Sequence, residues 1–466
     1  MPLDSNSKYE LISTSESFRD LRHLSDDKTV LENPHKGWYY HLVDNSLKSS
    51  LYRKDIEPHR FKTPGMHHMY LRFDWGDIEA RGEGIYDWSE LDRIMDEWGK
   101  FGYKFTLRIC TFESVEATIY ATPKWVFDMG ASFTEVSNGD LVGYEPDYND
   151  PIYLEKLDNF LAECARKFDN DPRIEYVDIG SFGTWGEGHT FAGSGKTFST
   201  ETVMAHINLH LKNFKNKQLV LNDDYIEAGY KNSPRDASFI YDYTLSKGLG
   251  LRDDSICVDG YVKLFGYDSL RRPSIFKEYA KNAPVDIELA HIYHQIPERF
   301  RDGLTALDAI KRAHATYAGF HGYEAEWLAK AEYLTEYLAN RLGYWFFIDG
   351  VDIGYPTSGT YEIVKVLISN KGYSKCYHQY DLKLRARSSD GKLYSLNSDY
   401  PDSTRWESDT VSEEAVKLNF TGVPAGKYTL DVGLFLGETP IKLGINASLK
   451  TDDGFYGLFE FTVNEL

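Results

Sequence analysis

Residues 68–109 read HMYLRFDWGDIEARGEGIYDWSELDRIMDEWGKFGYKFTLRI, and they give the clearest structural signal in the chain. The stretch begins and ends with short apolar runs, His68 to Phe73 and Lys104 to Ile109, which are typical of buried strands. Between these runs, Asp87 and Glu90 resemble a capping box that begins a helix. The apolar residues of that helix fall on one face: Leu91, Ile94, Met95 and Trp98. The stretch therefore predicts a strand, a helix and a second strand, the unit of a parallel sheet.

The same alternation of apolar runs and helical segments extends from about residue 31 to 350. The expected strands are Gly37 to Leu42, His68 to Phe73, Lys104 to Ile109, Ile174 to Ile179, Gln218 to Leu221, Cys257 to Leu264, Val285 to His291 and Gly319 to Glu324. A long helix is expected after Asp150 and Pro151. Its apolar stripe is Leu154, Leu157, Leu161, Cys164 and Phe168. Eight such units predict a (β/α)8 TIM barrel.

Beyond Trp345 the sequence changes to alternating runs separated by Gly, Asp and Pro turns. Examples are TYEIVKVLISNKG (360–372), YDLKLRARSSDGKLYSL (380–396) and FYGLFEFTV (455–463). These runs predict a small C-terminal all-β sandwich, which we expect to be immunoglobulin-like. The expected organisation is an N-terminal extension over 1–30, a catalytic barrel over 31–349 and an accessory β-sandwich over 350–466.

The composition narrows the possible partners. The 72 Asp and Glu residues outnumber the 52 Lys and Arg residues, and the basic residues form no cluster, so nucleic acid is not an expected partner. No stretch of about 18 apolar residues occurs, so membrane insertion is not expected. The first residues do not resemble a signal peptide, which predicts a cytoplasmic protein unless a signal has been trimmed from a surface, periplasmic or extracellular one. Four widely spaced cysteines are expected to be buried free thiols: Cys110, Cys164, Cys257 and Cys376.

Two carboxyl groups stand where a barrel places its active site, after the ends of the strands. Glu187 lies in GTWGEGH (183–189) after the fourth expected strand, and Glu288 lies in the seventh. Glycoside hydrolysis uses two carboxyl groups on opposite sides of the scissile bond. Strands four and seven face each other across a barrel, so we expect the two groups about 5 Å apart, the separation of a retaining enzyme. Arg72 would keep the nucleophile ionised, or would instead pair with Asp74 or Glu113.

The segment RFDWGDIEARGEGIYDWSELDRIMDEWGKFGYKFTLRI (72–109), followed by TPKWVF (122–127), resembles the second and third βα units of β-galactosidase-like barrels in clan A of the glycoside hydrolases. The wider layout, with NPHKGW (33–38) and GTWGEGH (183–189), is similar to a less characterised barrel family related to that clan. The resemblance implies that Glu187 is the acid/base and Glu288 the nucleophile of a two-carboxylate double displacement on an oligo- or polysaccharide. It implies no cofactor.

Two features depart from the clan pattern. The clan usually has Asn before the acid/base, where this chain has Gly186, and this change affects recognition of the sugar 2-hydroxyl. Glu288 could also lie one layer below the barrel mouth, in which case Glu324 or Glu326 would replace it as the nucleophile. The expected substrate-binding residues are Arg72, Trp75, Trp185, His189, Asn222, His291, Tyr293, Glu324 and Trp327.

Other interpretations remain open. Asn222, Asp223 and Asp224 could bind sugar hydroxyls or a cation, but such clusters more often form turns, so no metal site is expected. The main alternative function is a carbohydrate-binding barrel that has lost catalysis, and a lyase or isomerase is a further one, because a fold alone does not fix chemistry. The sugar, the linkage, the role of the C-terminal domain and the oligomeric state are not predicted.

Overall fold

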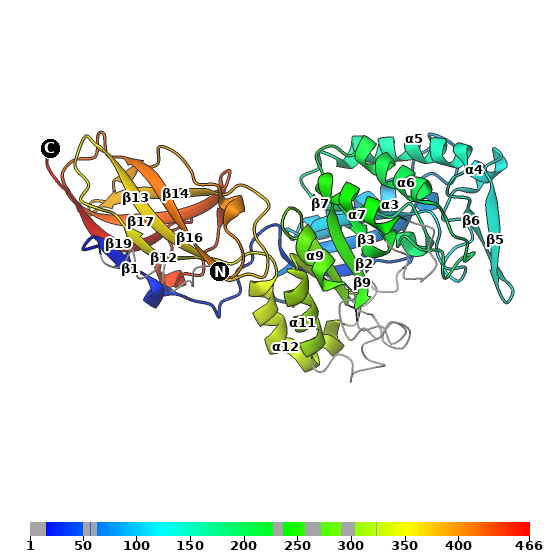
Figure 1. The fold of residues 1–466 in the computed structure, drawn as a ribbon, viewed down its shortest axis with the longest axis horizontal. Coiled ribbons are helices and arrows are strands. Elements are labelled where there is room, and N and C mark those ends of the chain that lie inside the picture. Colours follow the sequence, from blue (N-terminus) through cyan, green and yellow to red (C-terminus); the bar gives the residue numbers. More distant parts are fainter. Residues whose placement is uncertain are drawn as a thin grey trace. The chain divides into compact units, whose positions relative to one another are not determined.

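The computed structural model describes residues 15–49, 56, 63–226, 236–256, 272–289, 303–322 and 324–466. Its central feature is a closed parallel barrel with the strand order β10-β11-β2-β3-β4-β7-β8-β9. Among these strands, Figure 1 labels β2, β3, β7 and β9. The barrel strands are β2 (Gly37–Val43), β3 (Met66–Asp74), β4 (Lys104–Cys110), β7 (Ile174–Ile179), β8 (Leu219–Asn222), β9 (Gly250–Ile256), β10 (Val285–Leu289) and β11 (Tyr317–Phe320). The expected eight-stranded parallel barrel is therefore confirmed.

Helices follow most of these strands along the chain. They are α2 (Trp75–Ile78), α3 (Ser89–Gly99), α4 (Lys124–Asp128), α5 (Pro151–Phe168), α6 (Thr200–Asn213), α7 (Ala237–Ser246), α9 (Pro273–Tyr279), α11 (Leu304–Ala313) and α12 (Glu324–Arg341). Asp150 caps α5 as expected, since its side chain accepts hydrogen bonds from the Ile152 and Tyr153 amides. Leu154 is the exception in the predicted stripe of α5, because it is only half-buried.

The predicted start of α3 is wrong in detail. Asp87 and Glu90 do not form a capping box, because Trp88 is the N-cap residue and makes no side-chain cap bond. Asp87 instead accepts hydrogen bonds from the amide and hydroxyl of Ser89. The predicted apolar face is correct, and its four members are buried: Leu91, Ile94, Met95 and Trp98.

The sixth strand does not lie where the sequence pattern placed it. We expected Cys257 to Leu264, but the strand that pairs with both β8 and β10 is β9, Gly250–Ile256. Residues 257–271 lie outside the described part of the chain. The error has a physical cause, since β9 carries the charged residues Arg252, Asp253 and Asp254, and hydropathy alone interprets such a run as a loop.

Below the strand ends, aromatic side chains fill the barrel interior. Five residues from five different strands form one buried cluster, as side chains inside a closed barrel do. They are Tyr39, Tyr70, Tyr176, Tyr317 and Val220. Two of these tyrosines donate hydrogen bonds to carboxylates nearer the strand ends: Tyr70 to Asp178, and Tyr176 to Asp286. This aromatic layer therefore lies directly below the region in which the strands end, and two of its hydroxyl groups contact carboxylates of that region.

A second unit contains two antiparallel sheets. One has the order β1-β12-β13-β16, and the other contains β15, β14, β17 and β18, with β19 paired to β17. Their bounds are β1 (Phe18–Asp20), β12 (Phe346–Asp352), β13 (Tyr361–Asn370), β14 (Asp381–Ser388), β15 (Leu393–Ser395), β16 (Thr410–Asn419), β17 (Gly426–Leu436), β18 (Thr439–Ile441) and β19 (Tyr456–Val463). Residues of both sheets, such as Val364 and Leu430, belong to one hydrophobic core.

The chain divides into two compact units, of which the barrel unit is Trp38–Glu332. The other unit combines Tyr333–Leu466 with the N-terminal residues up to Gly37, because β1 pairs with β12. Within the described residues, no helix is both long and apolar enough to cross a membrane. The cysteines Cys110, Cys164 and Cys376 are free and buried, as expected, while Cys257 lies outside the described residues.

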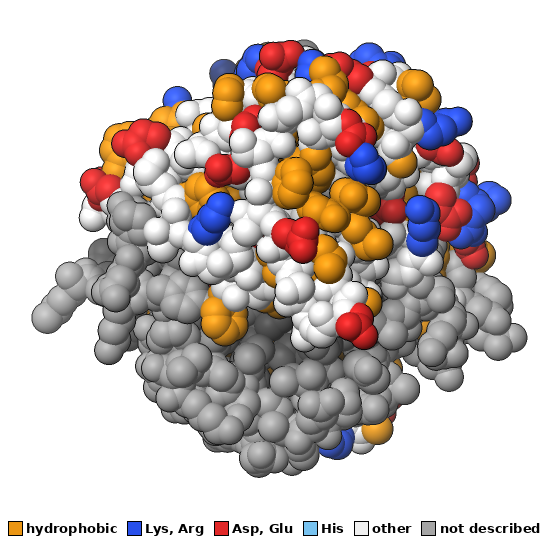
Figure 2. All heavy atoms as spheres, turned by 90° about the vertical axis from the view of Figure 1, so that its right-hand side faces the viewer, with side chains coloured by type: hydrophobic (Ala, Val, Ile, Leu, Met, Phe, Trp, Pro, Cys, Tyr) orange, Lys and Arg blue, Asp and Glu red, His pale blue; other side chains and the backbone are white. Residues whose placement is uncertain are grey.

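An antiparallel hairpin, β5 (Phe133–Asn138) and β6 (Leu141–Pro146), extends from the barrel unit (Figure 1). Large apolar side chains are exposed on and near it, including Ile119, Met129, Phe133 and Leu141. Figure 2 shows this end of the barrel unit, where hydrophobic side chains are interspersed with acidic and basic ones.

Candidate active site

Charged and polar side chains gather at the carboxyl ends of the barrel strands, where barrel enzymes place their chemistry. Each of these side chains belongs to a residue that is at most 7% exposed. The set comprises His41, Asp44, Arg72, Arg108, Glu113, Asp178, Glu187, Arg252, Asp254, Glu288 and His321. Buried charges are stable only when they are paired, so their partners define the site.

Glu288 lies near the end of β10 and contacts three cationic or imidazole groups. Its Oε2 atom is 2.7 Å from Arg252 Nη1 and 3.2 Å from His41 Nε2, and its Oε1 atom is 3.2 Å from His321 Nδ1. Burial opposes ionisation of Glu288, but the charges of His41, His321 and Arg252 outweigh it and hold its pKa well below the ordinary value. Glu288 is therefore a carboxylate at neutral pH.

Glu187 follows the short helical turn η3 (Thr184–Gly186), which comes after β7. Its Oε1 atom is 3.1 Å from Arg108 Nη2, and its Oε2 atom is 3.3 Å from His189 Nε2. The Phe191 amide donates to His189 Nδ1, so Nε2 carries the hydrogen that faces Glu187. Burial raises the pKa of Glu187, but the His189 hydrogen bond and the Arg108 charge outweigh it and lower the pKa overall.

The backbone before Glu187 is tightly constrained. Trp185 has a left-handed conformation with φ of 56°, which is uncommon for a residue other than glycine and is typical of functional sites. Its carbonyl accepts hydrogen bonds from Arg108 and from the Cys110 thiol. A Cβ atom at Gly186 would lie 2.4 Å from the Gly180 carbonyl oxygen. The loop therefore requires glycine where the clan pattern has Asn, and Glu187 is not a solvated residue on a loose turn.

Asp254, on β9, connects the two glutamates. Its Oδ1 atom is 3.2 Å from Arg252 Nη1, the same nitrogen that contacts Glu288. Burial, the negative charges of Glu187 and Glu288, and a hydrogen bond shared with Glu187 raise the pKa of Asp254 well above the ordinary value. Two carboxyl groups that share a hydrogen bond cannot both be ionised easily. Among Glu187, Asp254 and Glu288, this favours two carboxylates and one protonated carboxyl group, Asp254.

Arg72 pairs with Asp44 and Glu113 among the described residues. Its Nη2 atom is 2.6 Å from Asp44 Oδ1 and 3.8 Å from Glu113 Oε2. Among the described residues the guanidinium that contacts Glu288 is that of Arg252, so the expectation that Arg72 keeps the nucleophile ionised is wrong. Burial raises the pKa of Glu113 to about 8, because the attraction of Arg72 only partly offsets it.

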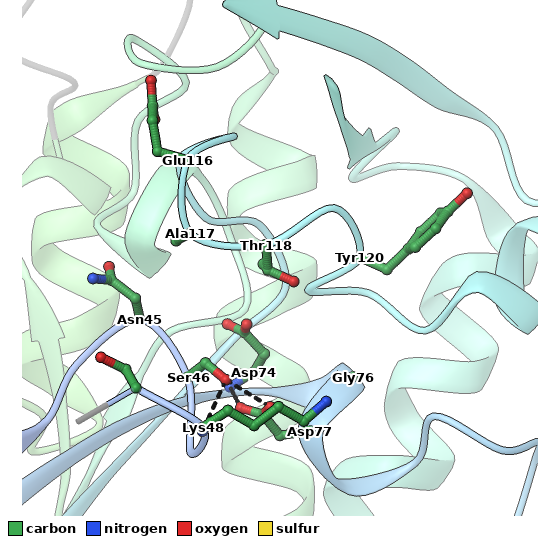
Figure 3. A pocket seen from close by; sticks show the side chains of 11 residues that line it. Asn45, Ser46, Lys48, Asp74, Gly76, Asp77, Glu116, Ala117, Thr118 and Tyr120 are labelled. Carbon is green, nitrogen blue, oxygen red and sulfur yellow. Dashed lines mark hydrogen bonds between the residues drawn. The ribbon is translucent and has the colours of Figure 1, made fainter. Parts of the chain in front are cut away.

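A pocket of about 420 Å³ borders this cluster (Figure 3). Its lining includes Asn45, whose Oδ1 accepts a 2.6 Å hydrogen bond from Arg72, and Asp74 at the end of β3. The remaining lining residues are Ser46, Lys48, Ser49, Gly76, Asp77, Glu116, Ala117, Thr118 and Tyr120. The volume falls within the usual range of small-molecule pockets, and most of the lining is polar.

Two tryptophans expected to bind substrate are buried in the aromatic core. Trp75 is fully buried, stacks on Phe160 and donates its indole hydrogen to Glu79. Trp327 is 3% exposed and packs edge-on against Trp38. Neither ring presents a face to a ligand in this structure, so both expectations are wrong.

The other expected substrate contacts divide into three groups. Trp185 is partly exposed, and its ring packs edge-on against His189 in the loop that carries Glu187. Asn222 is buried and caps the turn η4 (Asp223–Tyr225) by accepting from the Asp224 amide. His291 and Tyr293, and the side chains of Glu324 and Glu326, lie outside the described residues.

Sequence reasoning missed several members of the site. Arg252 and Asp254 escaped notice because the sixth strand was misplaced, although charges two residues apart in a strand point to the same side. His41, Asp44 and His321 were missed because each stands alone in the sequence. Their donor atoms lie within 4.8 Å of one another, which makes them a candidate metal-binding group.

No protein-family model matches this chain, and no curated protein matches it. Several solved structures that are similar in fold are glycoside hydrolases. The catalytic domain of a β-amylase from Paenibacillus polymyxa is 11% identical with a TM-score of 0.40, over 60% of this chain and 92% of that chain. A β-galactosidase from Marinomonas ef1 is 11% identical with a TM-score of 0.35, over 56% and 50%. A broad-specificity GH5-4 endoglucanase from an uncultured bacterium is 12% identical with a TM-score of 0.36, over 68% and 95%.

Proposed function

We propose that this protein is a retaining glycoside hydrolase with Glu288 as the nucleophile and Glu187 as the acid/base. The observation that carries the proposal is the buried set of three carboxyl groups at the strand ends, Glu187, Asp254 and Glu288. Their surroundings lower the pKa of Glu187 and Glu288 and raise the pKa of Asp254, which favours two carboxylates and one protonated group. A glycosidase needs an ionised nucleophile together with a nearby proton for the leaving group. The sequence resemblance to clan A is a second, independent support.

The chemistry would proceed in two displacements. In the first, a Glu288 oxygen attacks the anomeric carbon, the bond to the leaving oxygen breaks, and Glu187 donates a proton to that oxygen. Because Glu187 is ionised at rest, it first takes this proton from Asp254 through their shared hydrogen bond. In the second, Glu187 accepts a proton from water as the water oxygen displaces Glu288, and that proton returns to Asp254.

The surroundings suit a carbohydrate substrate. Trp185 is partly exposed next to Glu187, where an aromatic ring can stack on the C–H face of a sugar. The pocket beside Asn45 and Asp74 offers polar groups for sugar hydroxyls. Within this proposal, the two antiparallel sheets of the other unit form an immunoglobulin-like sandwich that acts as an accessory domain.

The test is hydrolysis of aryl glycosides and natural oligosaccharides by the wild type and by Glu187→Gln and Glu288→Gln. Glu175→Gln is the matched control, because its side chain is also buried and paired, with His67, but it lies at the opposite end of the barrel. We expect activity in the wild type and the control, and loss in both site variants. A 2-deoxy-2-fluoro glycoside should leave a covalent sugar on the peptide that contains Glu288. A label on Glu324 or Glu326 would move the nucleophile to strand eight.

One observation favours a second candidate, a carbohydrate-binding protein without catalysis. Glu187 is paired with both Arg108 and His189, which makes it a weak acid catalyst unless Asp254 supplies the proton. This candidate predicts sugar binding in calorimetry with no hydrolysis of any substrate. It also predicts that Glu288→Gln leaves the affinity for sugar unchanged.

A further inference from the structure

We propose that His41, Asp44 and His321 form a binding site for a divalent transition-metal ion, for which Zn²⁺ is the best match. The proposal does not depend on the glycosidase assignment. It rests on the placement of three donor groups, on the carboxylate behind them and on a buried imidazole, His41, whose nitrogens make no hydrogen bond of ordinary geometry to a described residue.

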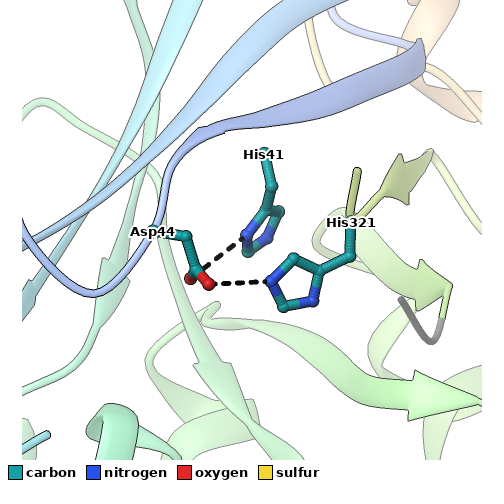
Figure 4. Close-up of side chains that lie close together, drawn as sticks. All are labelled: His41, Asp44 and His321. Atoms are coloured by element: carbon teal, nitrogen blue, oxygen red, sulfur yellow. Dashed lines mark hydrogen bonds and ion pairs between the residues drawn. The ribbon is translucent and has the colours of Figure 1, made fainter. Parts of the chain in front are cut away.

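The three side chains converge from two neighbouring strands. His41 lies on β2, Asp44 follows that strand, and His321 follows β11, which pairs with β10 and neighbours β2 in the barrel. Figure 4 shows the two imidazoles on the same side of the Asp44 carboxylate, each with one ring nitrogen directed toward it. Asp44 Oδ2 is 3.1 Å from His321 Nε2, and Asp44 Oδ1 is 3.9 Å from His41 Nδ1. Tetrahedral ligands at about 2.1 Å from zinc lie about 3.4 Å from each other. The 3.1 Å between Asp44 Oδ2 and His321 Nε2 is close to this value, and one donor atom from each of the three residues lies within 4.8 Å of the others.

Glu288 lies behind both histidines. It contacts His41 through Nε2 and His321 through Nδ1, each at 3.2 Å, so it faces the ring nitrogens that point away from Asp44. Metal-binding histidines almost always donate their outer N–H to a carboxylate or carbonyl, which fixes the tautomer and the ring orientation. One carboxylate would here orient both rings and leave His41 Nδ1 and His321 Nε2 as the donors to the metal.

An ion pair alone does not account for His41. A protonated His321 between Asp44 and Glu288 would be a satisfied group, and no metal would be required for it. His41 is 1% exposed, however, and neither of its ring nitrogens makes a hydrogen bond of ordinary geometry to a described residue. A buried polar group without a partner is costly, and a metal ion at Nδ1 would remove that cost.

The nearby charges leave room for a cation. Arg72 contacts Asp44 through Oδ1. The Oδ2 atom faces His321 and accepts one long hydrogen bond of 3.4 Å from Asn45, so it is the oxygen that a metal ion would contact. The carboxylate of Glu288 adds a negative charge on the far side of the histidines. Two imidazoles and one carboxylate favour zinc or a similar first-row ion, because Mg²⁺ and Ca²⁺ prefer sites made of oxygen atoms alone.

The test is zinc uptake by the full chain. Protein stripped with a chelator is equilibrated with Zn²⁺, dialysed and analysed for metal content, and zinc affinity is measured by competition with a chromophoric chelator. We expect one tightly bound zinc in the wild type, and binding at least about tenfold weaker in Asp44→Asn and His321→Asn. His67→Asn is the matched control, because His67 is also paired with a carboxylate, Glu175, but belongs to the opposite end of the barrel. The control should bind zinc like the wild type.

Two outcomes would overturn the proposal: no zinc uptake by the stripped wild type, or equal affinity in the wild type and the site variants. If the variants fail to fold, anomalous diffraction at the zinc edge from wild-type crystals gives the answer without any substitution. A peak between His41, Asp44 and His321 would support the site. A zinc peak elsewhere, or none, would reject it.

Discussion

Arg252 Nη1 lies 2.7 Å from Glu288 Oε2, and both side chains are buried among the barrel strands. The same guanidinium contacts Asp178 at 2.8 Å and Asp254 at 3.2 Å, so one cation holds three carboxyl groups in place. It is therefore the group whose removal should disturb both the stability of the barrel and the ionisation of the proposed nucleophile.

Replacing Arg252 with Met should raise the pKa of Glu288, because a neighbouring positive charge is lost. Activity that needs ionised Glu288 should then be lost at a higher pH as the solution is made more acidic. The acid limb of the kcat/KM profile therefore moves to higher pH. Leaving buried carboxylates without their cation should also cost about 3–5 kcal/mol of unfolding free energy. The checks are a pH–rate profile and urea unfolding. Arg252→Lys keeps the charge and should shift the acid limb less, and equal shifts in the two variants would contradict the electrostatic explanation.

In the proposed mechanism, replacing Asp254 with Asn should remove the proton that Glu187 receives. We expect kcat to fall by about 10²–10⁴ on substrates with poor leaving groups. Activated aryl glycosides should lose much less, because their leaving groups depart with little protonation. The measurement is the dependence of kcat on leaving-group pKa. A uniform loss across the series would show that Asp254 has only a structural role.

Replacing Gly186 with Ala should destabilise the loop that carries Glu187. Gly186 has a φ of 72°, and an added Cβ would lie 2.4 Å from the Gly180 oxygen. The left-handed backbone alone costs a residue with a side chain about 1–2 kcal/mol. Gly195→Ala is the control, since Gly195 has a φ of 66° but no atom within 4 Å of the added Cβ. Thermal unfolding should give a larger loss for Gly186→Ala, and similar losses would mean that the loop adapts to the side chain.

The pH dependence of stability should include a contribution from Glu113. Its pKa is raised to about 8 in the folded protein, so between its unfolded pKa and about 8 the folded state binds more protons than the unfolded state. This group therefore lowers the stability as the pH rises through that window. Glu113→Gln should remove this effect. The unfolding free energy of the variant minus that of the wild type should therefore be larger at pH 8 than at pH 5. Urea unfolding at the two pH values measures this, and an unchanged difference between the proteins would contradict the buried neutral carboxyl group.

The barrel could be predicted from the sequence because most of its strands are apolar runs that hydropathy recognises. The strand β9 could not, because its inward charges are neutralised by residues far away in the sequence: Arg252 by Asp178 and Glu288. A pattern search along the chain has no access to such partners. The neighbouring segment 257–264 is more apolar and was therefore preferred.

The candidate site was predicted in outline only. Glu187 and Glu288 belong to one network in the structure, but the groups that join them, Arg252 and Asp254, were not expected. Trp75 and Trp327 were misassigned because an aromatic residue beside a strand end suits the core as well as a ligand. Sequence position near a strand end therefore selects candidates, whereas burial decides among them.

The pairing of β1 with β12 has a consequence for synthesis of the chain. Ser17 and Asp352, which are hydrogen-bonded at this edge, stand 335 positions apart, with the whole barrel between them. During translation the early strand must remain unpaired until the barrel has emerged from the ribosome and its partner follows. We therefore expect the barrel, which is inserted in the sequence between the two parts of the other unit, to fold first. The other unit then forms when β1 pairs with β12. Because the barrel between them is already folded, the effective loop is shorter and the entropic cost of closing it is lower.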